Sequence, residues 1–210
     1  MTRRTNANRV LTASGSSEWF TPPHVIARVR HTFRGTIDLD PCSCDEAQAV
    51  VGASSWHSLD TRGEDSGARE VSWTPVRGRV SRVFVNPPYG HETSKWIARV
   101  VEPENRETIL LVNNHTHRKW FSLLWDHAAV ICFPWRPLRF LTLRSAITAG
   151  AKGYRDVPEY PELVEGMQPT HGSVLALFLP PTSPPGDSAT ARRFAEAFSD
   201  IGKIIRQDHL

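Results

Sequence analysis

The sequence has few cysteines and no long hydrophobic run. Its 210 residues include three cysteines, Cys42, Cys44 and Cys132, and no CxxC pair. An odd number without paired spacing argues against a disulfide framework and is typical of a reducing compartment. No stretch reaches the roughly 18 apolar residues of a membrane span, so we expect none. Cys42, Cys44 and His57 lack the spacing of zinc sites, and we predict no metal.

Familiar ligand-binding and targeting signals are also missing. The chain has neither GxGxxG nor a P-loop, the two common phosphate-binding motifs. Residues 1–16 lack the apolar core of a secretory signal, and we predict a disordered arm there. The 25 Lys and Arg residues against 22 Asp and Glu leave a net charge of +3. This mild excess fits a generic soluble surface as well as contact with a polyanion.

From residue 17 onward, short apolar segments alternate with segments of helical periodicity. Strands are predicted at 36–41, 80–86, 107–114, 128–133 and 172–180. Helices are predicted at 44–51, 92–102, 119–127 and 188–199, and another begins after Thr21, which is placed to cap it, and ends at Gly35. The alternation indicates an α/β fold with a largely parallel sheet. We expect one domain over 17–210, with a loop insertion at about 144–169.

The stretch VFVNPPYG, residues 83–90, ends an apolar strand on a polar amide followed by two prolines and a tyrosine. The sequence is a good turn, but it lies at a strand's carboxyl end, where α/β proteins bind ligands. The Asn86 amide oxygen and carbonyls left free by proline can accept hydrogen bonds from an exocyclic amine. Held by two acceptors, such an amine can direct its lone pair at an electrophilic methyl group, with positioning lowering much of the barrier.

NPPY after an apolar strand resembles the catalytic motif of S-adenosylmethionine-dependent amino methyltransferases. The segments SSEWFTPP, IDLDPCSC, WHSLD, VFVNPPYG and NNHTHRKWF, in this order, resemble the phage-type DNA N6-adenine methyltransferase family, as do RPLRF and HGSVLALFLP. The resemblance covers roughly residues 17–205. It implies a Rossmann-like methyltransferase fold with helices flanking the sheet, S-adenosylmethionine as cofactor and double-stranded DNA as partner. It also implies a cytoplasmic enzyme, in the bacterial host if phage-encoded, with a place in restriction–modification.

The resemblance also assigns roles to residues. For catalysis it implies Asn86, Pro87, Pro88 and Tyr89. Asn86 and the Pro87 carbonyl would hold the adenine amine, and Tyr89 would stack on a base flipped out of the duplex. Other NPPY enzymes methylate cytosine N4, RNA guanine or protein glutamine, and a catalytically silent DNA-binding relative is a further alternative.

Residues implied to bind the cofactor lie on three segments before the NPPY turn. They are Phe20, Thr21, Pro22, Asp38, Asp40, Pro41 and Asp60. A carboxylate at Asp40 suits the cationic methionine part of the cofactor. Its alternative is a turn or cap residue, and that of Asp60 is a solvated loop acid. The turn after Asp40 reads DPCSC, without the glycines usual in methyltransferases.

The residues implied to contact substrate follow two later strands. They are Asn113, Asn114, Thr116, His117, Arg136 and Arg139. Asn114 or Thr116 could instead cap a helix, and the two arginines could lie in a solvated loop. His115 and His117 lack the partner motif of a metal site, and we favour surface or DNA contacts. We expect Trp120 to lie in the core rather than to serve as a stacking platform.

Overall fold

The computed structural model describes residues 19–58, 72–74, 79–90, 92–147, 151–166, 171–183 and 188–206. A seven-stranded mixed sheet forms its centre, in the order β10-β5-β9-β4-β3-β1-β2. Its strands are β1 (Leu39–Ser43), β2 (Ser55–Ser58), β3 (Ser81–Val85), β4 (Arg106–Asn113), β5 (Val130–Pro134), β9 (Ser173–Phe178) and β10 (Gly202–Arg206). The predicted α/β fold is confirmed, with a parallel core and helices on both faces.

Strands β2, β1, β3 and β4 are parallel neighbours, whereas β9 is antiparallel to β4 and β5, and β10 is antiparallel to β5. The carboxyl ends of β1, β3, β4 and β5 therefore meet at one edge of the sheet. Chain segments that leave these ends are brought together there, and this is the edge where α/β sheets bind ligands.

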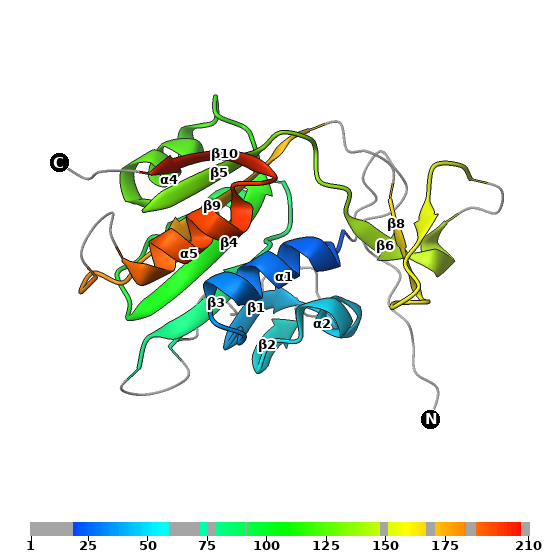
Figure 1. Cartoon of the computed structure of the whole chain (residues 1–210), viewed down its shortest axis with the longest axis horizontal. Coiled ribbons are helices and arrows are strands. Elements are labelled where there is room, and N and C mark those ends of the chain that lie inside the picture. Colours follow the sequence, from blue (N-terminus) through cyan, green and yellow to red (C-terminus); the bar gives the residue numbers. More distant parts are fainter. Residues whose placement is uncertain are drawn as a thin grey trace.

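Two helical layers bury the two faces of this sheet (Figure 1). Helices α1 (Pro23–Thr32) and α5 (Ala189–Phe198) lie side by side on one face, with α2 (Asp45–Val51) beside β1. Helix α3 (Thr93–Val100), the 3₁₀ helix η1 (Lys119–Phe121) and α4 (Ser122–His127) cover the other face. Alternate side chains of each strand point to opposite faces of the sheet. Ile109 and Leu111 of β4 pack in the hydrophobic cluster that includes α1 and α5, and Leu110 and Val112 pack in the cluster that includes α3 and α4.

A second, three-stranded antiparallel sheet lies beyond the carboxyl end of β5, in the order β6-β8-β7 (Figure 1). It contains β6 (Leu141–Leu143), β7 (Arg155–Asp156) and β8 (Leu163–Glu165), with the 3₁₀ helix η2 (Arg144–Ala146). The sequence predicted a loop insertion here, and the described residues instead form this small sheet. Phe20 pairs with Leu141, each backbone N–H donating to the other carbonyl at 2.8 Å, so the small sheet is fastened to the start of α1.

Most predicted elements are found within a few residues of their predicted bounds. The strand expected at 36–41 is wrong in its limits, because β1 begins at Leu39 and continues through Pro41 to Ser43. Pro41 is tolerated at this point because the pairing of β1 with β2 is irregular between Asp40 and Ser43. Strands β2 and β10 were not predicted. No described helix is long and apolar enough to cross a membrane.

Candidate active site

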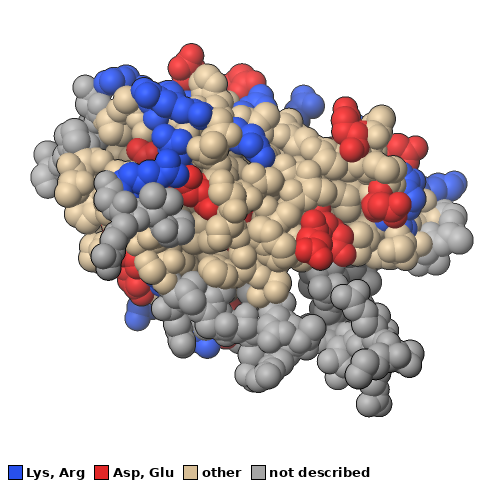
Figure 2. Space-filling view, turned by 90° about the horizontal axis from the view of Figure 1, so that it is seen from below, with Lys and Arg blue, Asp and Glu red and all other residues tan. Residues whose placement is uncertain are grey.

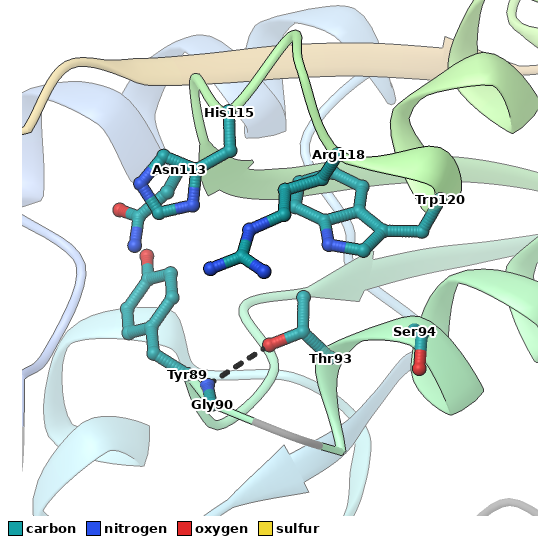
Figure 3. Close-up of a pocket in the computed structure, with 8 residues that line it drawn as sticks. All are labelled: Tyr89, Gly90, Thr93, Ser94, Asn113, His115, Arg118 and Trp120. Carbon is teal, nitrogen blue, oxygen red and sulfur yellow. Dashed lines mark hydrogen bonds between the residues drawn. The ribbon is translucent and has the colours of Figure 1, made fainter.

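The NPPY turn leaves β3 beside the carboxyl end of β4. Val85 of β3 pairs with Leu110 of β4, so Asn86 and Asn113 emerge at the same edge of the sheet. A cavity of about 370 Å³ opens there between the NPPY turn, the start of α3 and the segment after β4 (Figure 3). Tyr89 and Asn113 both line it, and in Figure 3 their polar groups point toward one another. The structure thus brings together one predicted catalytic residue and one predicted substrate contact.

The side-chain amide of Asn86 is held from both ends. Its Nδ2 lies 3.4 Å from the Trp19 carbonyl oxygen and 3.2 Å from Thr21 Oγ1, and its Oδ1 accepts from the Tyr89 hydroxyl at 3.1 Å. A carbonyl oxygen only accepts hydrogen bonds, so the amide NH₂ must face Trp19. The amide oxygen is consequently directed away from α1, toward Tyr89.

The ring of Tyr89 is fixed by a second aromatic residue. Phe140, which follows β5, meets it edge to face, with 6.4 Å between ring centroids. Burial raises the pKa of the Tyr89 phenol, with a smaller contribution from Cys42, so the hydroxyl stays protonated and donates to Asn86. Burial also raises the pKa of the thiol of Cys42 in β1, which lies close enough to the phenol to act on its pKa. The neighbour of Tyr89 on β1 is therefore a neutral sulfur.

Thr21 does not cap α1 as predicted. The N-cap is Pro22, which makes no side-chain capping bond, and α1 begins at Pro23. Thr21 is buried, and its hydroxyl accepts from Asn86 instead. Phe20 is buried too, in its pairing with Leu141. The segment implied to bind the cofactor therefore also supports the Asn86 amide.

Asp40 is a buried carboxylate whose hydrogen-bond partners among the described residues are all neutral. It accepts from Gln48 Nε2 at 3.0 Å and from the Cys42 backbone N–H at 3.4 Å, and Gln48 also donates to Ser43 Oγ at 2.7 Å. Burial raises its pKa to about 6, although these hydrogen bonds act in the opposite direction. A buried anion with no cation beside it in the described chain fits a positively charged ligand group, such as the methionine ammonium of S-adenosylmethionine.

Asp38, which the resemblance implied as a cofactor residue, lies at the other end of β1 from the NPPY edge of the sheet. This residue precedes β1, and its carboxylate pairs with Arg79 Nη2 at 2.5 Å and accepts the Arg82 backbone N–H at 2.9 Å. Both partners belong to the segment entering β3, so Asp38 joins β1 to β3. Asp60 lies outside the described residues.

The predicted substrate residues are only partly gathered at the cavity. Asn113 is half-buried and lines it, whereas Asn114, Thr116 and His117 are exposed on the turn before η1. No helix is capped by Asn114 or Thr116, because η1 has Arg118 at its N-cap position and α4 has Phe121.

The two predicted arginine contacts differ in their surroundings. Arg136 is exposed after β5, while Arg139 donates to the Gly166 carbonyl at 3.3 Å and so supports the small sheet.

Several residues of the site were not predicted from the sequence. The cavity is also lined by Gly90, Thr93, Ser94 and Arg118, for which the sequence indicated no role, by Trp120, which was expected in the core, and by His115, for which surface or DNA contacts were favoured. Trp120 is half-buried rather than a core residue. Trp19 acts through its backbone carbonyl, for which a sequence carries no signal. The contact of Gln48 with Asp40 could have been predicted, because Gln48 follows Asp40 by eight residues and lies on the face of α2 that is turned toward it.

The cluster of histidines near the cavity does not form a metal site. His115 lies between His117 and His171, with ring centroids 5.7 and 5.1 Å away. In the described part of the chain, no group of three or more His, Cys, Asp or Glu residues could hold a metal ion.

The chain matches the model of a known protein family. A family model described as DNA N-6-adenine-methyltransferase (Dam) matches residues 10–156, which is more than half of the chain. The matched region contains Thr21, Asp40, the NPPY turn and the cavity-lining residues. A search of the curated proteins finds no match.

Asp40 should make cofactor affinity depend on pH. Its pKa is about 6, and only the ionised carboxylate attracts a cation, so affinity should rise with pH through that value. Below it, we expect S-adenosylmethionine affinity to fall by up to about tenfold per pH unit. Calorimetric titration at a series of pH values measures this. Asp40→Asn should bind more weakly near neutral pH by about 1.5–3 kcal/mol and lose the dependence. The same pH profile in wild type and variant would restrict Asp40 to ordering the turn.

Thr21 should affect turnover through Asn86. Thr21→Val keeps the shape and removes the acceptor for Asn86 Nδ2, so the amide is less well oriented. We expect turnover to drop about 5–30-fold, which corresponds to one lost hydrogen bond. Thr21→Ser, the matched control, should remain close to wild type. Single-turnover kinetics and cofactor titration separate the two roles: weaker cofactor binding with unchanged turnover would show that Thr21 serves only the cofactor.

Proposed function

Since the chain belongs to the DNA N-6-adenine-methyltransferase (Dam) family, it transfers a methyl group from S-adenosylmethionine to adenine N6 in DNA, and we propose that Asn86 is the residue that holds the adenine amine during this transfer. The observation that supports this role is the orientation of the Asn86 side-chain amide. Trp19 and Thr21 occupy the NH₂ end, and the oxygen is left for a hydrogen-bond donor.

The Tyr89 hydroxyl occupies the position that an amine would take. It donates to Asn86 Oδ1 at 3.1 Å, and an N–H of adenine can replace it there when the tyrosine ring turns to stack on the base. The buried phenol stays protonated, so Tyr89 acts as donor and stacking surface and not as a base.

The two proline carbonyls of the turn are not equivalent. The Pro88 carbonyl accepts from Thr93 Oγ1 at 3.2 Å and is therefore engaged. The Pro87 carbonyl accepts no hydrogen bond from the residues that the structure describes, and we assign it as the second acceptor for the amine. Two acceptors on the two N–H groups direct the nitrogen lone pair away from the ring plane.

When bound, S-adenosylmethionine supplies an electrophilic methyl group. Asp40 would bind the ammonium group of the cofactor through its carboxylate. Asn86 and Pro87 would orient the adenine amine toward the methyl group. Transition-state positioning of this kind supplies much of the rate without a strong base.

The target base lies inside a duplex stack, so we infer that it is flipped out before reaction. We further propose that the partner is double-stranded DNA, that the methylation protects against restriction, and that the enzyme works in the bacterial cytoplasm. These proposals rest on the resemblance to phage-type enzymes. A further candidate, a silent DNA-binding relative, is favoured by the missing glycines after Asp40, whereas the intact NPPY turn and the residues that support it favour an active enzyme.

Nucleoside mass analysis of DNA from cells that express the protein tests the proposal. We expect N6-methyladenine with wild type, and a rate lower by about 10²–10³ in Asn86→Ala, because an acceptor used at the reacting amine is lost. The variant should still bind S-adenosylmethionine, which serves as the control for folding. N4-methylcytosine in place of N6-methyladenine would contradict the assigned substrate, and near-normal turnover of Asn86→Ala would contradict the assigned role.

Variants of Tyr89 separate stacking from hydrogen bonding. Tyr89→Phe keeps the ring and removes the donor to Asn86, whereas Tyr89→Ala removes both. We expect the alanine variant to lose catalytic efficiency worth on the order of 1–3 kcal/mol, the range of one base–aromatic stack, and the phenylalanine variant to lose less. Steady-state kinetics on duplex DNA measures the difference. Equal losses in the two variants would assign the contribution to the hydroxyl rather than the ring.

A further inference from the structure

The cavity beside Tyr89 has an electrostatic character of its own. Its volume is about 370 Å³, which is in the range of small-ligand sites. None of the described residues that line it is acidic, and one of them, Arg118, carries a permanent positive charge. A site with a cation and no carboxylate attracts an anion.

Arg118 has no partner of opposite charge in the part of the chain that the structure describes. Its backbone N–H donates to the His115 carbonyl at 2.9 Å, which fixes the start of η1, but its guanidinium makes no hydrogen bond or ion pair with the described residues. Figure 3 shows the guanidinium pointing into the space between Tyr89 and Thr93, with Trp120 behind its stem. Six other arginines do pair with carboxylates: Arg28, Arg79, Arg99, Arg106, Arg144 and Arg155.

The histidines near the cavity do not oppose this preference. His115 lines the cavity, and His117 and His171 lie against it. Burial lowers the pKa of His115, with further lowering from His171, His117 and Arg118. Each of these neighbours is a cation or becomes one on protonation, and none of them would repel an anion.

Phosphate is the anion that this enzyme's substrate carries on every nucleotide. Guanidinium groups bind phosphate oxygens with charge-assisted hydrogen bonds. Tyr89 forms one wall of the cavity and is also the residue on which the proposed function places the flipped base. A phosphate bound here would consequently belong to the target nucleotide or to its immediate neighbour.

We propose that this cavity is a phosphate-binding subsite, in which Arg118 holds a DNA phosphate that flanks the flipped adenine and so keeps the base on Tyr89. The inference rests on the proposed function, because it takes DNA as the substrate. Arg118 binds and positions, and it takes no part in the methyl transfer.

A duplex that carries one neutral phosphate tests the subsite. The methylated sequence is first mapped in DNA from expressing cells. Duplexes are then made with a single methylphosphonate on the 5′ or the 3′ side of the target adenine, and kcat/KM is measured for each. With wild type, we expect a loss of about tenfold or more at one of the two positions, because a charge-assisted contact is removed.

In Arg118→Ala, kcat/KM on ordinary DNA should fall by a similar factor. On the methylphosphonate duplex to which wild type is sensitive, kcat/KM of the variant should fall no further. Arg118→Lys should recover part of the loss, since it restores charge without the planar fork. Lys203→Ala is the matched control: it removes one exposed positive charge from β10, and should behave as wild type on all duplexes. Labelled S-adenosylmethionine binding checks that every variant is folded.

The outcomes separate the two hypotheses. Absence of adenine methylation by wild type on the unmodified duplex contradicts the proposed function, and the subsite with it. Methylation of the unmodified duplex together with equal rates on both modified duplexes overturns the subsite alone. Losses that multiply in Arg118→Ala and the methylphosphonate duplex also overturn it, because they would show that arginine and phosphate act independently.

Discussion

The hydrogen bonding of one amide, that of Asn86, constrains the architecture of the active site. The backbone carbonyl of Trp19 accepts from its NH₂ group, and this forces the oxygen to face the Tyr89 side. The amide belongs to the end of β3, while the carbonyl belongs to the segment that precedes α1, 67 residues earlier. The amide proposed to hold the adenine amine is therefore oriented only when these two distant parts of the chain are packed together.

The small sheet contributes to the same constraint. Phe20 pairs with Leu141 of β6, so the carbonyl of the neighbouring residue, Trp19, is held in place by β6. Gly166, at the end of β8, lies against the Trp19 ring, and a Cβ at Gly166 would come within 2.6 Å of that ring. Only glycine fits this contact without displacing the ring. The sheet that follows β5 is thus connected, through Trp19, to the amide at the end of β3.

The sequence predicted the parallel core and the position of the NPPY turn, because both depend on local patterns. Apolar strands and amphipathic helices have characteristic periods, and the turn has an unusual composition. It did not predict β10, which has only two apolar residues in Lys203–Arg206 and is a strand because β5 offers a free edge. The small sheet was missed for a related reason: its strands have two or three residues each and no measurable period.

Within the site, residue type was predicted better than role. Thr21 is a good N-cap residue by propensity, but Pro22 already starts the helix and the hydroxyl is used by Asn86. Asp38 and Asp40 are alike in the sequence and differ only in partners, since Arg79 neutralises the first. The role of such a residue depends on partners that come from distant segments of the chain, and a local sequence pattern does not reveal these partners.

Charge is distributed so that substrate attraction depends on a few positions. The net charge is +3. On the face shown in Figure 2, Lys and Arg side chains are interspersed with Asp and Glu, and the coloured, described residues form no continuous basic surface. Each phosphate contact contributes separately to DNA affinity. Arg118 at the cavity and Arg136 beyond β5 are both exposed, and the proposed subsite at Arg118 would place one such contact next to the reacting base, where it would favour a flipped adenine over simple contact with the duplex.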